Sequence, residues 1–391
     1  MKAHILLSEL LKEEVENKFA AGVQLLVSRD GQNIFYSKYG YADIEKKQEL
    51  STDTIYRMYS MTKPVTAVMA SVLQKQGKLN FNEKVSYYFP EFKKMYVVYG
   101  GEKREAKKEI TLWHLLHMTS GIVYPDADEA GRDMQTLFDR IHMAIQNGNE
   151  YSTQEIARMI GKQPLAFEPG SEWRYGLSAD VLGAIMEKAA DKPLAEVYKE
   201  ILFDPLNMSD TGFFVPENKQ NRLATLYKAE GSVFCEDKQR HLGLTCGEKM
   251  PEFISAGAGL YSTMEDYAHF LTMLAQGGVY QGNRILDEST VESFGKNALS
   301  NKQRKNMNLP HMRMYGYSQL MRVYLPESKK NSQGVPGEFG WDGWTGPYFS
   351  VDRKNKLFFL YLTQISGYSH WDFIWKLRNG IFNLIGEREN E

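Results

Sequence analysis

The sequence predicts an α+β fold, in which one antiparallel sheet built from both ends of the chain lies beside a mostly helical region. Two segments with strand character, Val23–Ser28 and Asn33–Tyr39, come near the start of the chain. Three more, Tyr315–Tyr324, Tyr348–Val351 and Leu357–Thr363, come near its end, and the long stretch between them reads as helices and loops. Strands that alternate with helices throughout would indicate a parallel sheet. This grouping instead indicates one sheet closed by the two termini.

The elements at the start of the chain follow from local patterns. The first residues carry apolar side chains with a period near 3.6, which predicts an amphipathic helix; they are Ile5, Leu6, Leu10, Leu11 and Val15. A hairpin is expected next, because Asp30 and Gly31 supply the positive φ angles that a tight turn requires. The chain therefore opens with a helix followed by two paired strands.

The elements at the end of the chain have equally local signals. The polar turn Asp352–Asn355 separates the last two strand segments, so they are expected to form a second hairpin. The apolar periodicity of His370–Ile385 predicts a final helix. We therefore divide the chain into a discontinuous sheet region, 1–59 and 311–391, and a mostly helical region, 60–310, which together form one catalytic unit with the active site between them.

Composition and charge exclude several classes of function. The 391 residues carry 47 basic and 49 acidic side chains, a formal net charge of -2, so no nucleic-acid partner is expected. No apolar run approaches the ~18 residues of a membrane span or has the form of a signal peptide. Cys235 and Cys246 lack metal-site spacing and read as free thiols. These features predict a cytoplasmic protein without a membrane partner, and they leave its oligomeric state open.

Ser60 and Lys63 form an S-x-x-K motif at the start of a predicted helix, Ser60–Gln76, which Gly77 ends. Residues i and i+3 share a helix face, so the hydroxyl and the amine are expected side by side. The helix N-terminus places positive backbone potential at the serine. A partly desolvated lysine in that potential loses its proton near neutral pH and accepts one from serine, which would make Ser60 a nucleophile.

The motif alone does not establish catalysis. A second copy, Ser293–Lys296, shows how readily the pattern arises, although Gly295 within it weakens the helix that the geometry requires. The esterase elbow G-x-S-x-G is absent from the sequence, and no histidine stands in a context that indicates a Ser-His-Asp triad. His114 and His117 have the spacing of a metal pair without further ligands. We therefore expect structural histidines, no metal and no cofactor.

Five stretches, taken in order, resemble the serine β-lactamase and penicillin-binding superfamily, in particular class C β-lactamases and family VIII carboxylesterases. They are Tyr59–Pro64 (YSMTKP), Ile110–Gly121 (ITLWHLLHMTSG), Phe167–Tyr175 (FEPGSEWRY), Ala256–Thr263 (AGAGLYST) and Gly340–Gly346 (GWDGWTG). The likeness spans roughly residues 20–365. It implies a β-lactamase/transpeptidase-like fold and a serine hydrolase that works through an acyl-enzyme on Ser60.

The resemblance also implies roles for further residues. Tyr175 stands at the tyrosine of the family's Y-x-N motif, where its phenol is implied to share a proton with Lys63 as general base and acid. From the residues alone, a tyrosine with a pKa of ~10 needs a cationic neighbour to act as a base, and Lys63 could be that neighbour. Without the family context, Tyr175 would be one of 23 tyrosines packed beside a helix. The backbone N–H groups of Ser60 and Trp344 are implied to form the oxyanion hole.

Two family positions carry different residues here. Leu177 stands in place of the Y-x-N asparagine, and Trp341-Asp342-Gly343 stands in place of K-T-G, similar to the W-G-G of family VIII esterases. The family's lysine supplies a positive charge for a substrate carboxylate, whereas here an indole replaces it and Asp342 adds a negative charge. We assign these four residues to substrate binding, and expect the small-molecule acyl substrate to be neutral.

The leading hypothesis is a serine hydrolase that cleaves small acyl esters, or amides, through Ser60, Lys63 and Tyr175. An acyltransferase that uses the same acyl-enzyme is the first alternative, because only the group that removes the acyl chain separates the two. A β-lactamase or D-alanyl peptidase is less compatible with Trp341. A non-catalytic binding protein would need none of the three reactive residues, so it is disfavoured.

Overall fold

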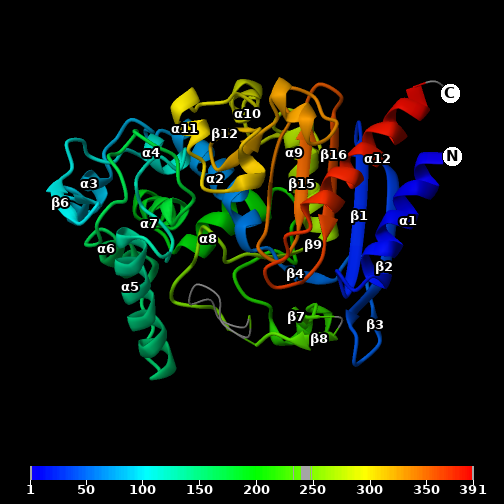
Figure 1. Ribbon diagram of the computed structural model, residues 1–391, viewed down its shortest axis with the longest axis horizontal. Helices are drawn as coiled ribbons and strands as arrows, with labels where there is room; N and C mark the ends of the chain where they lie inside the picture. The colour runs from blue at the N-terminus through cyan, green and yellow to red at the C-terminus, as the bar shows by residue number, and fades with distance from the viewer. Residues whose placement is uncertain (1, 232, 239–246, 248, 390–391) are drawn as a thin grey trace.

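The computed structural model describes residues 2–231, 233–238, 247 and 249–389 (Figure 1). Its main feature is an eight-stranded antiparallel sheet with the order β12-β13-β14-β15-β16-β1-β2-β3. The strands are β1 (Gly22–Arg29), β2 (Gln32–Asp43), β3 (Gln48–Glu49), β12 (Gly316–Ser318), β13 (Met321–Val323), β14 (Phe339–Asp342), β15 (Tyr348–Asp352) and β16 (Leu357–Leu362). The two ends of the chain meet where β1 pairs with β16, which confirms the predicted fold class.

The sheet is covered on both faces. Alternate residues of β1 point to opposite sides, as the pleat of a strand requires. Val23 and Leu25 belong to the apolar cluster formed with α1 (Lys2–Glu16) and α12 (Trp371–Glu389), whereas Leu26 belongs to the larger cluster that includes α9 (Met264–Ala275). Figure 1 shows α1 and α12 side by side at the sheet, with both termini nearby. Both faces of β1 are therefore buried.

One predicted strand is in fact two. Tyr315–Tyr324 contains β12 and β13, which pair as a hairpin through Gln319 and Leu320. These two residues have φ angles of 42° and 63°, a conformation that normally selects glycine or asparagine. The turn therefore has no signal in the sequence. The hairpin of β1 and β2 and that of β15 and β16 occur as predicted.

The middle of the chain is mostly helical, and α7 lies at its centre in contact with α2, α3, α4, α6 and α8. Its helices are α2 (Thr62–Lys75), α3 (Val85–Tyr88), α4 (Leu112–Leu116), α5 (Glu129–Gln146), α6 (Thr153–Ile160), α7 (Ser178–Ala190), α8 (Leu194–Tyr198), α10 (Glu288–Phe294) and α11 (Asn301–Lys305). Small two-stranded pairs join them: β4 (Ile55–Arg57) with β9 (Tyr261–Thr263), β5 (Tyr96–Tyr99) with β6 (Glu102–Glu105), β7 (Tyr227–Glu230) with β8 (Val233–Glu236), and β10 (Val279–Tyr280) with β11 (Asn283–Arg284). Helix α2 is buried on every side from Thr62 to Leu73, so it forms a rigid central support.

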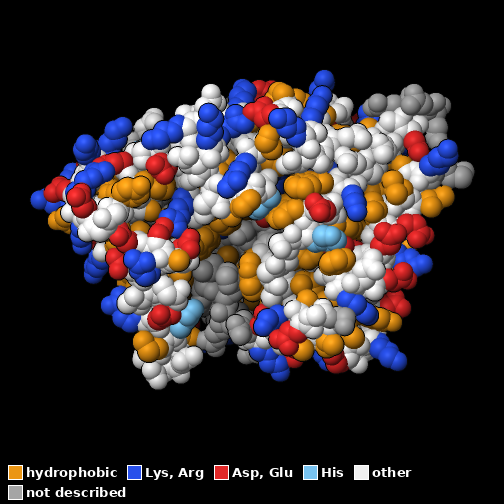
Figure 2. All heavy atoms as spheres, in the orientation of Figure 1, with side chains coloured by type: hydrophobic (Ala, Val, Ile, Leu, Met, Phe, Trp, Pro, Cys, Tyr) orange, Lys and Arg blue, Asp and Glu red, His pale blue; other side chains and the backbone are white. Residues whose placement is uncertain are grey.

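The surface carries both signs of charge. Figure 2 shows basic and acidic side chains interspersed over the visible face, in line with the small net charge. No helix in the described ranges combines the length and the apolar character needed to cross a bilayer. Cys235 is an exposed free thiol, and Cys246 lies outside the described residues.

Candidate active site

Ser60 lies in a tight turn directly before helix α2. The turn is the 3-10 helix η1 (Tyr59–Met61), so Ser60 stands just outside the α-helix and not in its first turn. Tyr59 has a φ of 42°, an uncommon conformation for a residue with a large side chain. Backbone strain of this kind persists where the surroundings hold it. One such restraint is the hydrogen bond that Tyr267 Oη donates to Met61 O at 2.8 Å.

The amine of Lys63 is buried and surrounded by uncharged oxygens. Its Nζ donates to Gly257 O at 2.8 Å, to Tyr124 Oη at 2.9 Å and to Ser60 Oγ at 3.3 Å. Burial disfavours the charged form and lowers the pKa of Lys63 to about 7. An amine with this pKa is a base at neutral pH and lies within reach of the serine hydroxyl.

Tyr175 is the second polar neighbour of Ser60. Its hydroxyl is hydrogen-bonded to the Ser60 side chain and accepts a hydrogen bond from Trp341 Nε1 at 3.3 Å. Lys63 Nζ lies over the phenol ring, 4.6 Å from its centroid. Burial raises the pKa of Tyr175, so the phenol keeps its proton at neutral pH. Of the two groups, Lys63 and not Tyr175 therefore has the labile proton.

Sequence reasoning missed Tyr124. Its hydroxyl accepts a hydrogen bond from Lys63, its ring centroid lies 5.5 Å from that of Tyr175, and it lines the cavity at Ser60. Its position three residues after Gly121 of the ITLWHLLHMTSG stretch is the one signal that could have indicated it.

A buried carboxylate supports Lys63 from behind through one peptide group. Asp180 Oδ1 accepts from Ser255 Oγ at 2.6 Å and from Gly257 N at 3.1 Å, and Gly257 O in turn accepts from Lys63. A Cβ atom on residue 257 would lie 2.6 Å from Asp180 Oδ2, so any larger residue at this position would displace the Asp180 carboxylate. Burial raises the pKa of Asp180, and the nearby Lys63 opposes that rise.

The end of β14 packs against the Ser60 turn. A Cβ atom on Gly343 would lie 2.7 Å from Met58 O, so only glycine permits this approach. The Tyr59 and Trp344 rings meet edge to face at 5.3 Å between centroids. The segment that carries Trp344 therefore lies beside the segment that carries Ser60. Their backbone N–H groups as an oxyanion hole remain a prediction.

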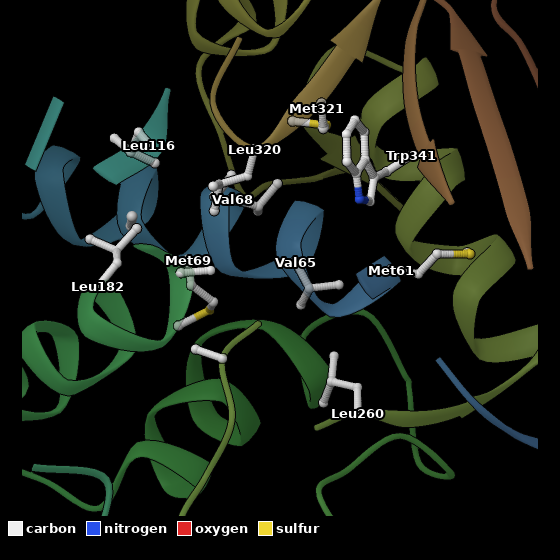
Figure 3. Packing of buried hydrophobic residues seen from close by; sticks show 14 of the residues in the cluster. Met61, Val65, Val68, Met69, Leu116, Leu182, Leu260, Leu320, Met321 and Trp341 are labelled. Atoms are coloured by element: carbon white, nitrogen blue, oxygen red, sulfur yellow. The ribbon is translucent and has the colours of Figure 1, made fainter. Parts of the chain in front are cut away.

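Of the four residues assigned to substrate binding, the structure brings three to the cavity. Trp341, Asp342 and Gly343 line it, whereas Leu177 is 1% exposed, belongs to the core and is not among the described lining residues. Trp341 is itself only 1% exposed, and Figure 3 shows its indole among buried apolar residues that include Val65 and Met321. Trp341 thus supports Tyr175 and leaves little surface for a substrate.

The cavity has a volume of about 600 Å³ and contains both Ser60 and Tyr175 in its lining. Its other walls are largely aromatic and include Tyr59, Phe138, Trp344, Tyr368 and Trp371. Walls of this kind bind apolar groups by burial and ring contacts.

Asp342 is paired, which the sequence did not predict. Arg322 Nη1 lies 3.2 Å from Asp342 Oδ1, and Arg322 is 3% exposed. Burial raises the pKa of Asp342 to about 6, although Arg322 and Lys63 favour its ionised form. The expected lone negative charge is therefore partly compensated by Arg322, a residue that no motif marks.

The chain is similar to proteins that are named as esterases, carboxypeptidases and hydrolases. Esterase EstB of Burkholderia gladioli is 26% identical over 380 residues, which cover 91% of this chain and 89% of the esterase. A putative D-alanyl-D-alanine carboxypeptidase of Salmonella agona is 26% identical over 375 residues, covering 88% of this chain and 79% of that protein. The solved structure of EstCE1, described as a hydrolase with promiscuous acyltransferase activity, matches with a TM-score of 0.79 at 22% identity over 97% of this chain and 99% of its own.

The structural likeness to EstCE1 supports a shared fold, and the match to a family model assigns the chain to a family. The model described as Beta-lactamase matches residues 7–377, nearly the whole chain. The matched region includes the Ser60 turn, helix α2 and the end of β14. The chain belongs to the beta-lactamase family of serine hydrolases.

Proposed function

We propose that this protein cleaves small, neutral acyl esters through an acyl-enzyme on Ser60, with Lys63 as general base and Tyr175 as general acid. The set of contacts around Lys63 carries the proposal. A neutral amine has two N–H groups and one lone pair. The two shorter contacts, to Gly257 O and Tyr124 Oη, use the two N–H groups and leave the lone pair for Ser60 at 3.3 Å.

Acylation follows from these positions. Ser60 Oγ attacks the ester carbonyl carbon while Lys63 accepts the serine proton. The backbone N–H groups of Ser60 and Trp344 stabilise the oxyanion. When the carbon–oxygen bond of the leaving group breaks, Tyr175 donates its proton to the departing oxygen, and the proton held by Lys63 restores the phenol. Water then attacks the acyl carbonyl carbon while Lys63 takes a proton from it. The bond between that carbon and Ser60 Oγ breaks, Lys63 returns the proton to Ser60 Oγ, and the carboxylic acid leaves.

The substrate class rests on the cavity. Its aromatic walls favour apolar acyl and alcohol groups, and Trp341 stands in place of the lysine of the K-T-G motif. A relative that aligns with 91% of this chain, EstB, is named as an esterase, which supports ester substrates. Esters without a carboxylate therefore fit the site better than β-lactams or peptides with a free carboxyl terminus.

Acyl transfer is the second candidate. A cavity of about 600 Å³ exceeds the space that a short acyl chain needs, so an alcohol acceptor can bind beside the acyl-enzyme. Water and the alcohol would then compete for the same intermediate.

The test begins with covalent labelling. A fluorophosphonate probe should label Ser60, and Ser60→Ala should abolish both labelling and hydrolysis of p-nitrophenyl esters. Ser293→Ala, in the second S-x-x-K copy, is the matched control and should change neither. Nitrocefin assayed beside the esters measures β-lactam hydrolysis, and added alcohols measure transfer through ester products. Labelling that persists in Ser60→Ala would reject the proposed mechanism.

A further inference from the structure

We infer that Asp342 determines which substrates the site accepts by their charge. Its carboxylate occupies an anion subsite that Arg322 would otherwise offer to a carboxylate-bearing substrate. This inference rests on the proposed ester hydrolysis at Ser60 and adds to it a reason why charged acyl groups are refused. From the sequence, an indole replaces the lysine and Asp342 adds a negative charge that has no partner. In the structure the positive charge is present and is matched by the protein's own acid.

Arg322 is held in a fixed position. Its Nη2 donates to Phe349 O at 3.2 Å, and its guanidinium lies over the Tyr348 ring at 4.4 Å and the Tyr315 ring at 5.5 Å. Its Nη1 donates to Asp342 Oδ1 at 3.2 Å. Protein groups thus fix the guanidinium on several sides, and one of these groups, Asp342, lines the cavity.

Asp342 separates this charge from the cavity. The Asp342 side chain is 22% exposed and lines the cavity together with Ser60 and Tyr175. The Arg322 side chain is 4% exposed and is not among the described residues that line it. A bound substrate therefore meets the carboxylate and not the guanidinium.

The charge balance of the pair gives the prediction. Removing the Asp342 side chain leaves a buried arginine without its counter-ion, which is strongly unfavourable. It also opens a space that a carboxylate from outside can fill, restoring a charge-assisted hydrogen bond to Arg322. The same position should thus change from excluding carboxylates to binding them.

The first experiment compares two esters of nearly equal shape, p-nitrophenyl butyrate and mono-p-nitrophenyl succinate, in which a carboxylate replaces the terminal methyl group. In Asp342→Gly the ratio of kcat/KM for succinate over butyrate should rise roughly 10- to 150-fold, the range expected for one charge-assisted hydrogen bond. Asp342→Asn, which keeps a side chain in the space, should give a smaller rise. The double variant Arg322→Met, Asp342→Gly is the matched control and should lose most of this rise, because no guanidinium remains to bind the succinate carboxylate.

The second experiment needs no catalysis. Acetate should raise the thermal midpoint of Asp342→Gly, or restore its folding if it is unfolded alone, and should leave the wild type and the double variant unchanged. An unchanged ester ratio together with no acetate effect would overturn the inference. If the wild type fails to hydrolyse butyrate, the proposed function fails instead, and the acetate measurement still decides the subsite.

Discussion

Two buried cations in this protein, Lys63 and Arg378, have opposite surroundings. Arg378 is 0% exposed and donates to the Glu338 carboxylate at 2.6 Å, to Ser332 Oγ at 2.8 Å and to Tyr348 Oη at 3.1 Å. Lys63 is also 0% exposed, yet its three acceptors carry no formal charge. The pKa of Arg378 is raised by Glu338 despite burial, whereas burial lowers the pKa of Lys63 to about 7.

The difference separates a structural charge from a reactive one. A buried cation with its counter-ion keeps its proton and links the elements that carry the pair; here α12 is linked to the residue preceding β14. A buried amine whose hydrogen-bond partners are all uncharged is stabilised by losing its proton, so it becomes a base. We expect mutations at the two sites to have opposite effects on activity and stability.

The largest expected effect is on catalysis at Lys63. Lys63→Met removes the proposed base while filling the space with an apolar side chain of similar length. Acylation should fall by roughly 10²–10⁴-fold, the range for a positioned acid–base group, while the free energy of unfolding stays equal or rises. Ester hydrolysis and urea unfolding measure the two quantities. Lys75→Met, on the same helix at a partly exposed site paired with Asp287, should leave activity unchanged.

Tyr175→Phe tests whether Lys63 works in one proton pathway with the phenol. Alone it should reduce acylation by a similar factor, and the double variant with Lys63→Met should be little worse than either single variant. Losses that multiply would contradict a shared pathway.

The next effect is on stability at the paired site. Glu338→Gln leaves Arg378 buried without a counter-ion and should lower the free energy of unfolding by about 3–5 kcal/mol. The fraction that remains folded should still hydrolyse esters, because neither residue lines the cavity. Glu200→Gln breaks the exposed pair with Lys192 and should leave the free energy of unfolding nearly unchanged, because solvent screens this pair. Equal losses for the two variants would mean that burial does not distinguish these pairs.

A pH series sharpens the comparison. Acylation needs neutral Lys63, so its rate should rise with pH up to about pH 7 and then level off. Unfolded lysine keeps its proton to a pKa of about 10.4, so between these values the unfolded state binds more protons and stability rises with pH. The penalty for burying the charge is thus complete below about pH 7 and decreases by up to ~1.4 kcal/mol per unit above it.

Unfolding at pH 7 and pH 9 measures that slope. Lys63→Met should remove this contribution, so its stability relative to the wild type should decline as pH rises. Arg378 keeps its proton over the whole range and should add no slope. An identical pH dependence in wild type and Lys63→Met would show that the buried amine is not titrating.

The sequence predicted the parts of the fold that have local signals. Asp30 and Gly31 marked a hairpin, and apolar periodicity marked the terminal helices. It did not reveal the turn at Gln319 and Leu320, because these residues are not typical at positive φ.

The candidate site divides in the same way. Ser60 and Lys63 lie three residues apart, so a short sequence motif is enough to predict that they are neighbours. Tyr124 contacts Lys63 across 61 residues of sequence, and Arg322 contacts Asp342 across 20, without any fixed pattern. The first contact depends on how the loop between α4 and α5 lies against α2, and the second depends on the pairing of β13 with β14, so both appear only in the folded structure.

The smallest effect concerns the residue that holds Tyr175. Trp341→Phe removes the indole N–H that donates to Tyr175 Oη at 3.3 Å and keeps most of the buried ring. We choose phenylalanine and not the lysine of the K-T-G motif as the replacement. Position 341 is 1% exposed, so a charge there would destabilise the core. Loss of one neutral hydrogen bond corresponds to about 0.5–1.5 kcal/mol, so kcat/KM should fall roughly 2- to 13-fold. Trp173→Phe is the matched control, since this indole also stacks on Tyr175 at 6.4 Å but its Nε1 has no hydrogen-bond partner among the described residues. If both variants lose activity equally, ring packing and not the hydrogen bond from Trp341 positions the phenol.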